Sequence, residues 1–258
     1  MSAGQYDTYL SVNSAAWDYL AKHGCDSCQP YENAQLTSPI SRLDPDGWIP
    51  WEEVSTVLCL AAGGGQQAPL FGVAGRSVTS ADLCEEQLER DRWAASQVGL
   101  EIETVRADML NLAALHGRGF DLVYQAVSAC YVPDVRKLYQ EVRCVLRPGG
   151  LYWVEHWSPL HVQLCSTQLW DGGAYRISRP QQCTQPVPWA YDGGDERSSV
   201  CWHYIHGLRD LIGGICDAGF VVERLTEPWL GSQAAPPGSH EHLAAFLPPF
   251  VRMLARLR

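Results

Sequence analysis

A glycine-rich loop and a downstream acid are the residues whose spacing points most directly to chemistry. Gly63 and Gly65 follow the apolar run 54–61, and glycine lets the backbone approach a ligand with no Cβ in the way. Asp82 ends the next apolar run, close to the roughly 20 residues that separate loop and acid in a nucleoside-binding βαβ unit. A carboxylate at that place accepts hydrogen bonds from ribose hydroxyls. These residues predict a ligand that contains a nucleoside.

The elements that must position these residues are parallel strands and the helices between them. From residue 54 onward, short apolar runs alternate with helical stretches, which is typical of βαβ units around a parallel sheet. The carboxyl ends of such strands share one edge, where ligands bind in open α/β sheets. The expected strands are 54–61, 77–82, 101–108, 120–128 and 151–157, and the expected helices are 66–73, 85–99 and 135–146.

The other segments are expected to complete one domain of 258 residues. Residues 1–53 predict an amino-terminal helical cap, because aromatic and apolar residues recur there at helical spacing. Residues 158–200 lose the regular pattern and gain tryptophans and prolines, which indicates a lid insertion. The last segment, 201–258, is expected to hold a helix at 203–220 and strands at 221–227 and 242–247.

The charge balance narrows the classes of partner. The chain has 19 Lys and Arg against 29 Asp and Glu, a formal charge of -10, so its average surface repels phosphate backbones and anionic lipid. We therefore expect a small-molecule substrate, with no nucleic acid and no membrane as partner. The chain begins with neither a basic segment nor an apolar run of signal-peptide length. The expectation is a cytoplasmic protein whose ten cysteines stay reduced.

Two pairs of residues have a spacing that metal ligands also use. Cys25 and Cys28 form one CxxC, and no second CxxC or HxxxH completes a tetrahedral set. His203 and His206 are three apart on an expected helix, with no carboxylate–histidine set joining them in sequence. An incidental loop pair and two helix-surface histidines are the favoured interpretations. We expect no metal.

The glycine string is compatible with two classes of cofactor. GGGQQA from Gly63 matches the dinucleotide pattern G-x-G-x-x-[GA], which keeps a nicotinamide-dependent oxidoreductase open. The acid Asp82 is followed by ADML, then by FDLVYQAVS, then by LRPGGLYW. This succession resembles the class I S-adenosylmethionine-dependent methyltransferases, and more narrowly the small-molecule group that includes the ubiquinone and menaquinone type. The resemblance covers about residues 54–157, the expected cofactor-binding core.

The resemblance implies a Rossmann-like α/β fold with a largely parallel, seven-stranded sheet and helices on both faces. The implied cofactor is S-adenosylmethionine, which leaves as S-adenosylhomocysteine. Asp82 would hold the ribose, Asp108 and Met109 would frame the adenine, and Gln125 would lie beside the methionine part. The full set of implied cofactor contacts in the core is Ala61, Ala62, Gly63, Gly65, Asp82, Leu83, Asp108, Met109, Gln125 and Ala126.

The sequence departs from the family in the first motif. An acid usually stands where Cys59 is and a glycine where Ala61 is, so the expected acidic anchor near the cofactor's amino group is missing. Tyr6, Tyr9 and Trp17 of the cap are candidates for this contact, because such methyltransferases commonly close an amino-terminal helix over the cofactor. The missing acid also leaves open a non-catalytic module that binds S-adenosylmethionine.

The favoured activity is methyl transfer to an oxygen or nitrogen of a small metabolite, while a carbon or sulfur acceptor stays open. We expect a general base near the ends of the fourth and fifth strands. His156 ends the fifth strand and titrates near neutral pH, so it is the first candidate. Tyr131 and His161 are the second candidates. Glu155 alternates with His156 along the strand, so only one of the two should face the pocket.

Tryptophans are frequent in and beside the expected lid. A set of four would suit a cage for a cationic amine, because cations bind over aromatic faces. Ordinary packing of an insertion over the sheet explains the same residues equally well. The four are Trp157, Trp170, Trp189 and Trp202.

Overall fold

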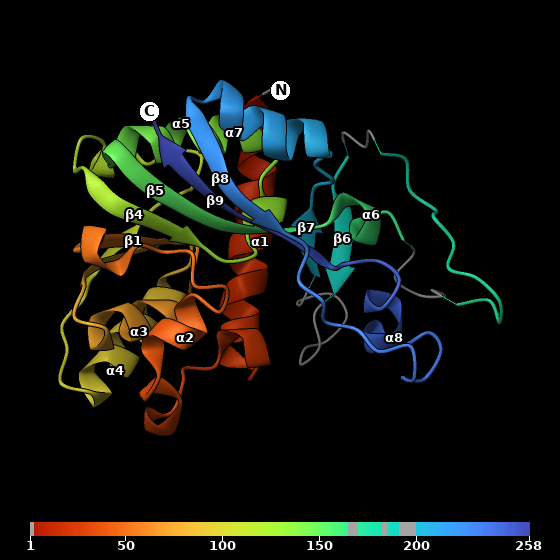
Figure 1. Cartoon of the computed structure of the whole chain (residues 1–258), viewed down its shortest axis with the longest axis horizontal. Coiled ribbons are helices and arrows are strands. Elements are labelled where there is room, and N and C mark those ends of the chain that lie inside the picture. Colours follow the sequence, from red (N-terminus) through yellow and green to blue (C-terminus); the bar gives the residue numbers. More distant parts are fainter. Residues whose placement is uncertain (1–2, 165–169, 182–184, 191–199) are drawn as a thin grey trace.

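A seven-stranded sheet lies at the centre of the part of the chain that is described (Figure 1). The computed structural model describes residues 3–164, 170–181, 185–190 and 200–258, without the side chains of 3–8 and 33–34. The strand order is β3-β2-β1-β4-β5-β9-β8. The strands are β1 Thr56–Leu60, β2 Ser77–Asp82, β3 Glu103–Arg106, β4 Phe120–Gln125, β5 Leu146–Trp157, β8 Phe220–Thr226 and β9 Phe250–Leu257.

The strand directions agree with the prediction of a largely parallel sheet. Strands β1 to β5 pair in parallel. Strand β9 runs antiparallel to both of its neighbours, β5 and β8. The carboxyl ends of β1 to β5 therefore share one edge of the sheet, as the sequence pattern predicted.

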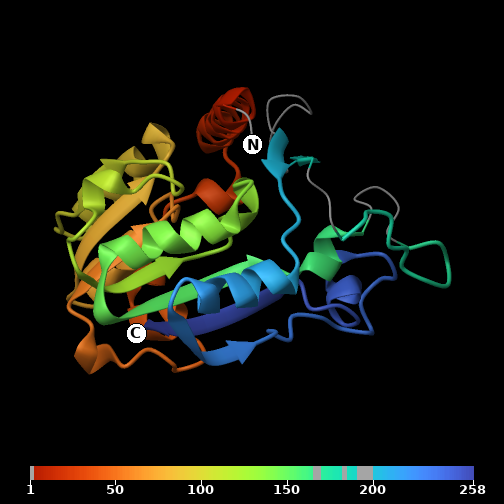
Figure 2. The ribbon, with the colours of Figure 1, turned by 90° about the horizontal axis from the view of Figure 1, so that it is seen from above.

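Helices cover both faces of the sheet (Figures 1 and 2). Along β1, Leu58 and Leu60 pack into one apolar cluster and Val57 and Cys59 pack into another, because successive side chains of a strand point to opposite faces. Burial on both faces explains why this strand is an unbroken apolar run. The helices are α2 Pro39–Leu43, α3 Gln67–Val73 and α4 Glu85–Gln97 on one face, and α5 Val135–Val145 and α7 Gly214–Asp217 on the other.

The amino-terminal segment is helical, as predicted, and its long helix α1 Ala3–Lys22 stands beside the sheet (Figure 1). The chain then makes short helical turns before it enters β1. These turns are η1 Asp26–Cys28, η2 Asn33–Leu36 and η3 Trp51–Glu53, with α2 between the last two.

The carboxyl-terminal strand prediction was wrong. The expected strand 242–247 overlaps the short helix α8 His240–Ala244, which Ser239 begins by accepting the His242 N–H at 3.1 Å. The true last strand is β9. Its Val251, Met253 and Ala255 point into one core cluster at period two, a pattern that the sequence analysis left unassigned.

Two other boundaries also differ. The expected helix 203–220 is replaced by β7 Val200–His203, a π-helical turn at Arg209–Gly213 and then α7. Strand β5 begins at Leu146 rather than after the Pro148-Gly149-Gly150 turn, because the pairing with β4 shifts register between Phe120 and Leu122 and takes the turn into the strand.

The expected lid, 158–200, is described only in part. It contains α6 Pro159–Val162 and β6 Val187–Ala190, which pairs antiparallel with β7. Residues 165–169, 182–184 and 191–199 of the predicted lid lie outside the described residues.

Candidate active site

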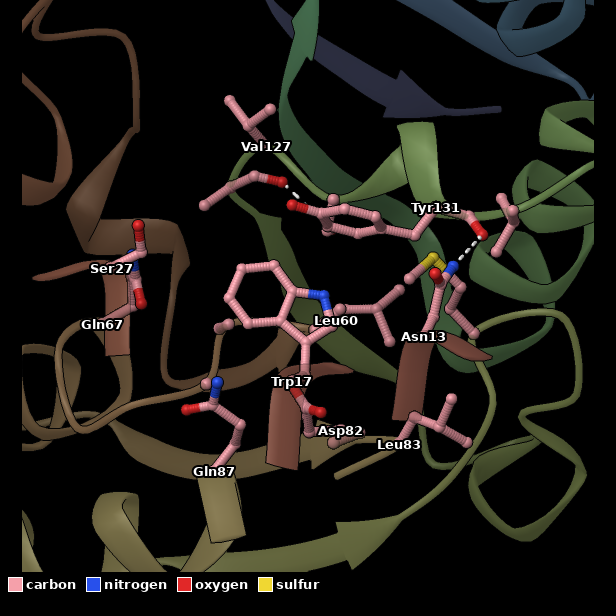
Figure 3. A pocket seen from close by; sticks show the side chains of 18 of the residues that line it. Asn13, Trp17, Ser27, Leu60, Gln67, Asp82, Leu83, Gln87, Val127 and Tyr131 are labelled. Carbon is pink, nitrogen blue, oxygen red and sulfur yellow. Dashed lines mark hydrogen bonds between the residues drawn. The ribbon is translucent and has the colours of Figure 1, made fainter. Parts of the chain in front are cut away.

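The carboxyl ends of the central strands line one cavity of about 390 Å³ (Figure 3). The structure brings most of the predicted site residues to it, while Gly65, Gln125, His156 and His161 are not among its lining residues. What each lining residue binds remains a prediction. The predicted residues that line the cavity are Tyr9, Trp17, Ala61, Ala62, Gly63, Asp82, Leu83, Asp108, Met109, Ala126 and Tyr131.

Asp82 and Gly63 form the end of the cavity that suits a nucleoside. Asp82 is half-buried where β2 ends, its Oδ1 accepts the Cys84 N–H at 2.8 Å, and burial raises its pKa to about 7. A Cβ added to Gly63 would lie 2.7 Å from the Gln87 Cβ, so only glycine keeps this backbone in place. The pair provides a carboxylate and a close backbone surface, which are the two features that a ribose needs.

Tyr9 ties the amino-terminal helix to the strand-end residues. Its hydroxyl donates to the Asp108 Oδ1 at 2.8 Å, and the Leu110 N–H donates to the same oxygen at 3.0 Å. Tyr9 is almost fully buried. The side chain of Tyr6, the other candidate in this helix, lies outside the described residues. The structure therefore closes the cavity on this side with α1.

Trp17 and Tyr131 cover the middle of the cavity, and their ring centroids are 5.4 Å apart at an interplanar angle of 80° (Figure 3). Asn13 holds this contact in place, because its Nδ2 donates to the Tyr131 carbonyl at 3.0 Å and its Oδ1 accepts the Trp202 N–H at 2.7 Å. Asn13 also lines the cavity. Sequence reasoning missed it, since a single polar residue inside an amphipathic helix carries no distinctive pattern.

His156 is not at the mouth of the cavity, which corrects the prediction for the general base. It is 2% exposed, its Nε2 lies 3.1 Å from the Tyr139 hydroxyl, and burial lowers its pKa to about 3. Its neighbours Glu155 and Trp157 line the cavity instead. The alternation of side chains along β5 did select one of the two adjacent residues, and it selected Glu155.

His161 also stays outside the cavity. Its ring stacks on Trp157 with centroids 5.1 Å apart, and burial lowers its pKa to about 4. A histidine kept neutral in this way acts as a packing partner of Trp157. Of the three predicted base candidates, only Tyr131 lines the cavity.

Glu155 forms an ion pair with Arg252, which Arg252 shares with a second carboxylate. Glu155 Oε1 accepts a hydrogen bond from Arg252 Nε at 2.9 Å and lies 2.6 Å from Nη2, and Arg252 Nη1 donates to Asp46 at 2.5 Å. Glu155 and Arg252 face each other across the antiparallel pair β5–β9. Burial raises the pKa of Glu155. This triad of Glu155, Arg252 and Asp46 was not predicted from the sequence, because β9, which carries Arg252, was unassigned.

The four tryptophans do not form one cage. Trp157 lines the cavity and lies 5.9 Å from Trp189 between ring centroids. Trp170 instead packs against His242 of α8, at 5.3 Å between centroids. Trp202 is half-buried against the core. Packing therefore explains most of this aromatic density.

Neither residue pair with metal-like spacing belongs to a larger group of possible ligands among the described residues. Cys25 and Cys28 are buried free thiols that pack with Cys201. His203 is buried at the end of β7 and His206 is half-buried in the loop that follows, which corrects the prediction of helix-surface histidines, and His206 Nε2 donates to the Val132 carbonyl at 2.9 Å. No group of three or more possible ligands occurs in the part of the chain that is described.

Comparison with known proteins identifies the family. The uncharacterized methyltransferase YbaJ of Bacillus subtilis is 32% identical over 225 residues, which are 83% of this chain and 88% of that protein. The chain belongs to the methyltransferases. A family described as a methyltransferase domain matches residues 58–154.

Two further comparisons agree with the methyltransferase family and with its fold. The ubiquinone biosynthesis O-methyltransferase of Actinobacillus pleuropneumoniae is 31% identical over 99 residues, 37% of this chain and 42% of that protein. The crystal structure of a putative S-adenosylmethionine-dependent methyltransferase from Listeria monocytogenes has a TM-score of 0.62 at 14% identity and covers 88% of this chain and 100% of that one. The family and fold favour a class I methyltransferase over the nicotinamide-dependent alternative.

A buried acid from another element lies close to Cys59, the position where the family usually has an acid. Asp91 of α4 is fully buried, and its carboxylate accepts the Gly65 N–H at 2.7 Å and the Ser80 hydroxyl at 2.5 Å. Burial raises its pKa to about 6. Burial first, and then the Asp91 charge, raises the pKa of the Cys59 thiol, so the two side chains are neighbours.

The burial of Asp91 could have been predicted from the sequence pattern of α4. The buried residues of α4 recur at helical spacing, and Asp91 stands in that stripe three residues after Leu88 and three before Ala94. A charged residue on the apolar face of a helix needs a buried partner. Here the partner is the end of the glycine loop.

Ala61 shows the cost of the second departure from the family. It has a φ of 47°, in the left-handed region that favours glycine, where the family has one. Its N–H donates to the Ala81 carbonyl at 2.7 Å. The loop therefore holds a left-handed conformation at a residue that is not glycine.

Gln125 lies behind the cavity rather than in it, contrary to its predicted place beside the methionine part. It is fully buried, donates to the Ser128 hydroxyl at 2.9 Å and accepts the Tyr152 hydroxyl at 2.5 Å. Ala126 and Ser128, which follow β4, line the cavity. Gln125 thus supports the turn that presents these residues.

Proposed function

We propose that this methyltransferase transfers a methyl group to an oxygen or nitrogen of a small molecule held in the 390 Å³ cavity. The observation that carries the proposal is that one cavity is lined by Asp82 and Gly63, which would suit a nucleoside, and also by Glu155 and Trp157 of β5, which β1 and β4 separate from β2. A cofactor and an acceptor placed there would share one enclosed space. Bound S-adenosylmethionine supplies an electrophilic methyl group on its sulfonium.

The chain's own residues bind, orient and exclude water. Asp82 and Gly63 would hold the ribose, and Asp108 and Met109 would frame the adenine. Trp17 and Tyr131 cover the centre of the cavity, where they would keep water away from the reacting atoms. Alignment of the reacting groups and exclusion of water are the main contributions that a protein makes to a displacement reaction.

The size of the cavity and the net charge of the protein support a small-molecule substrate. The cavity is bounded on one side by α1 through Tyr9, Asn13 and Trp17, and its volume of about 390 Å³ suits a small acceptor. A formal charge of -10 disfavours nucleic acid. Among the described residues, no helix is long and apolar enough to cross a membrane.

Incubation with labelled-methyl cofactor and a metabolite extract of the source organism tests the proposal. Mass spectrometry of the products should find the label on an oxygen or nitrogen of a small metabolite. Label found only in protein or nucleic acid, or on a carbon or sulfur atom, would contradict it. An Asp82→Ala enzyme is the negative control, because loss of the ribose contact should remove the signal at low cofactor concentration.

A further inference from the structure

The acceptor end of the cavity combines aromatic rings with one carboxylate. Glu155 and Trp157 of β5 and Phe250 of β9 line it, and in the sheet order β1 and β4 separate these strands from β2, which carries Asp82. Trp157 and Phe250 are register partners whose ring centroids lie 4.7 Å apart. This end of the cavity therefore sets apolar ring surface beside a carboxylate.

The charges around Glu155 do not cancel. The hydrogen bond from Arg252 Nε and the ion-pair contact from Nη2 both go to the same oxygen, Oε1. The guanidinium is shared with Asp46, at 2.5 Å, so two carboxylates face one cation. Arg252 is only 13% exposed in its side chain, which limits screening by solvent. This end of the cavity carries a net negative charge and leaves Oε2 of Glu155 outside the Arg252 contact.

We propose, building on the proposed function, that Glu155 recognises and deprotonates the acceptor, which is an amine carried on an aromatic or other flat ring. The ammonium form would be attracted by the net negative charge and by the Trp157 face. An acceptor with a carboxylate or phosphate at this place would be repelled. The proposal names a substrate class within the nitrogen branch of the function proposed above.

The chemical step balances with the groups already named. The ammonium gives one proton to Glu155 Oε2, which turns the carboxylate into a carboxylic acid and frees the nitrogen lone pair. A bond then forms between nitrogen and the methyl carbon while the bond from that carbon to sulfur breaks, and the electron pair of the broken bond stays on sulfur. Glu155 returns its proton to solvent when the methylated amine leaves.

Binding of simple ring compounds tests the proposal without knowledge of the natural acceptor. The protein saturated with S-adenosylhomocysteine would be titrated with benzylamine, benzyl alcohol and benzoate, and tryptophan fluorescence would report binding. Benzylamine should bind at least about tenfold more tightly than benzoate, with benzyl alcohol between them. In Glu155→Gln this preference should vanish, while the affinity for S-adenosylhomocysteine stays within about twofold.

Two further variants separate the charge of Glu155 from its structural role. Asp46→Asn changes a residue that does not line the cavity, and it should reduce the preference for benzylamine without abolishing it. Glu103→Gln is the matched control, because Glu103 is also a strand glutamate paired with an arginine, Arg118, at 2.6 Å. Glu103 lies outside the cavity, so its variant should retain the full preference.

The outcomes for this inference and for the proposed function are distinct. Equal or tighter binding of benzoate, or a preference that survives in Glu155→Gln, would overturn the role of Glu155 even if label transfer to a small molecule is found. A preference that depends on Glu155 supports that role even if the extract yields a labelled macromolecule, which would overturn the proposed function alone.

Discussion

The two ends of the cavity are built in different ways. At the proposed cofactor end, Gly63, Asp82 and Asp108 each follow or end a parallel strand, and Asp82 has no cationic partner among its hydrogen bonds. At the acceptor end, Glu155 is held by Arg252 across an antiparallel pair, and Arg252 is shared with Asp46. The cofactor end therefore depends on single residues, whereas the acceptor end depends on a charge balance among three.

This difference predicts how substitutions at each end of the cavity affect binding. A change at one strand end should remove one contact with the cofactor and leave the other end intact. A change in the triad should alter which acceptor binds, because the net charge is a property of the set. The following predictions test that separation, from the largest effect to the smallest.

Loss of Asp91 should have the largest effect, because it leaves the Gly65 N–H and the Ser80 hydroxyl buried without a partner. We expect Asp91→Ala to lower the free energy of unfolding by about 2 to 4 kcal/mol and to weaken cofactor binding. Urea unfolding and calorimetric titration with S-adenosylhomocysteine would measure both. Adding Cys59→Asp, which restores the family's acid next to the lost one, should recover part of each loss. If neither stability nor cofactor affinity is recovered, an acid at position 59 cannot take the place of Asp91.

Asp82→Ala should weaken binding of S-adenosylhomocysteine by about 1.5–3 kcal/mol, because it removes a charged acceptor for two ribose hydroxyls. Calorimetry measures the dissociation constant directly. Asp134→Ala is a suitable control, since Asp134 caps α5 by accepting the Lys137 N–H at 3.0 Å and does not line the cavity. An unchanged dissociation constant for S-adenosylhomocysteine in a folded Asp82→Ala variant would show that Asp82 does not bind the ribose.

The buried His156 predicts loss of stability in acid. Burial lowers its folded-state pKa to about 3, below the ordinary value of about 6.5. The unfolded chain therefore takes up the proton first, and stability present above pH 6.5 is lost as the pH falls toward 3. Between pH 6.5 and 5, the wild type should lose roughly 2 kcal/mol more than His156→Gln in urea unfolding. Equal losses would mean that His156 titrates normally.

Ala61→Gly should give the smallest effect and a gain. An alanine at a φ of 47° pays a left-handed backbone cost that glycine avoids, and the greater flexibility of unfolded glycine offsets part of it. We expect the free energy of unfolding to rise by about 0.5 kcal/mol, with cofactor affinity unchanged. Thermal unfolding checks the sign, and a lower midpoint would show that the loop carries no such strain.

The cofactor end was largely predictable from sequence because its residues follow apolar runs directly. Asp82, Leu83, Asp108 and Met109 all reach the cavity, since the end of a buried strand fixes where the next side chains stand. Asp91 was missed for the opposite reason. Its partner, the Gly65 N–H, is 26 residues away along the chain, and only the packing of α4 brings the two together.

The acceptor end was not predictable because it depends on the phase of β5. The irregular pairing of β4 with β5 between Phe120 and Leu122 prevents counting from the Pro148-Gly149-Gly150 turn. A shift by one residue exchanges the faces of Glu155 and His156. Arg252 could not be assigned either. A short apolar run such as 242–247 fits a strand and a helix equally well, and because it was taken as the last strand, β9 was left unassigned.

A crystal structure of the complex with S-adenosylhomocysteine tests most directly the claim that one cavity has a cofactor end and an acceptor end. The ribose hydroxyls should lie about 3 Å from the Asp82 carboxylate, and the sulfur should face open space that reaches Glu155 and Trp157. A complex in which the ribose lies away from Asp82, or in which the amino-acid part of the ligand occupies the space beside Glu155, would contradict the account.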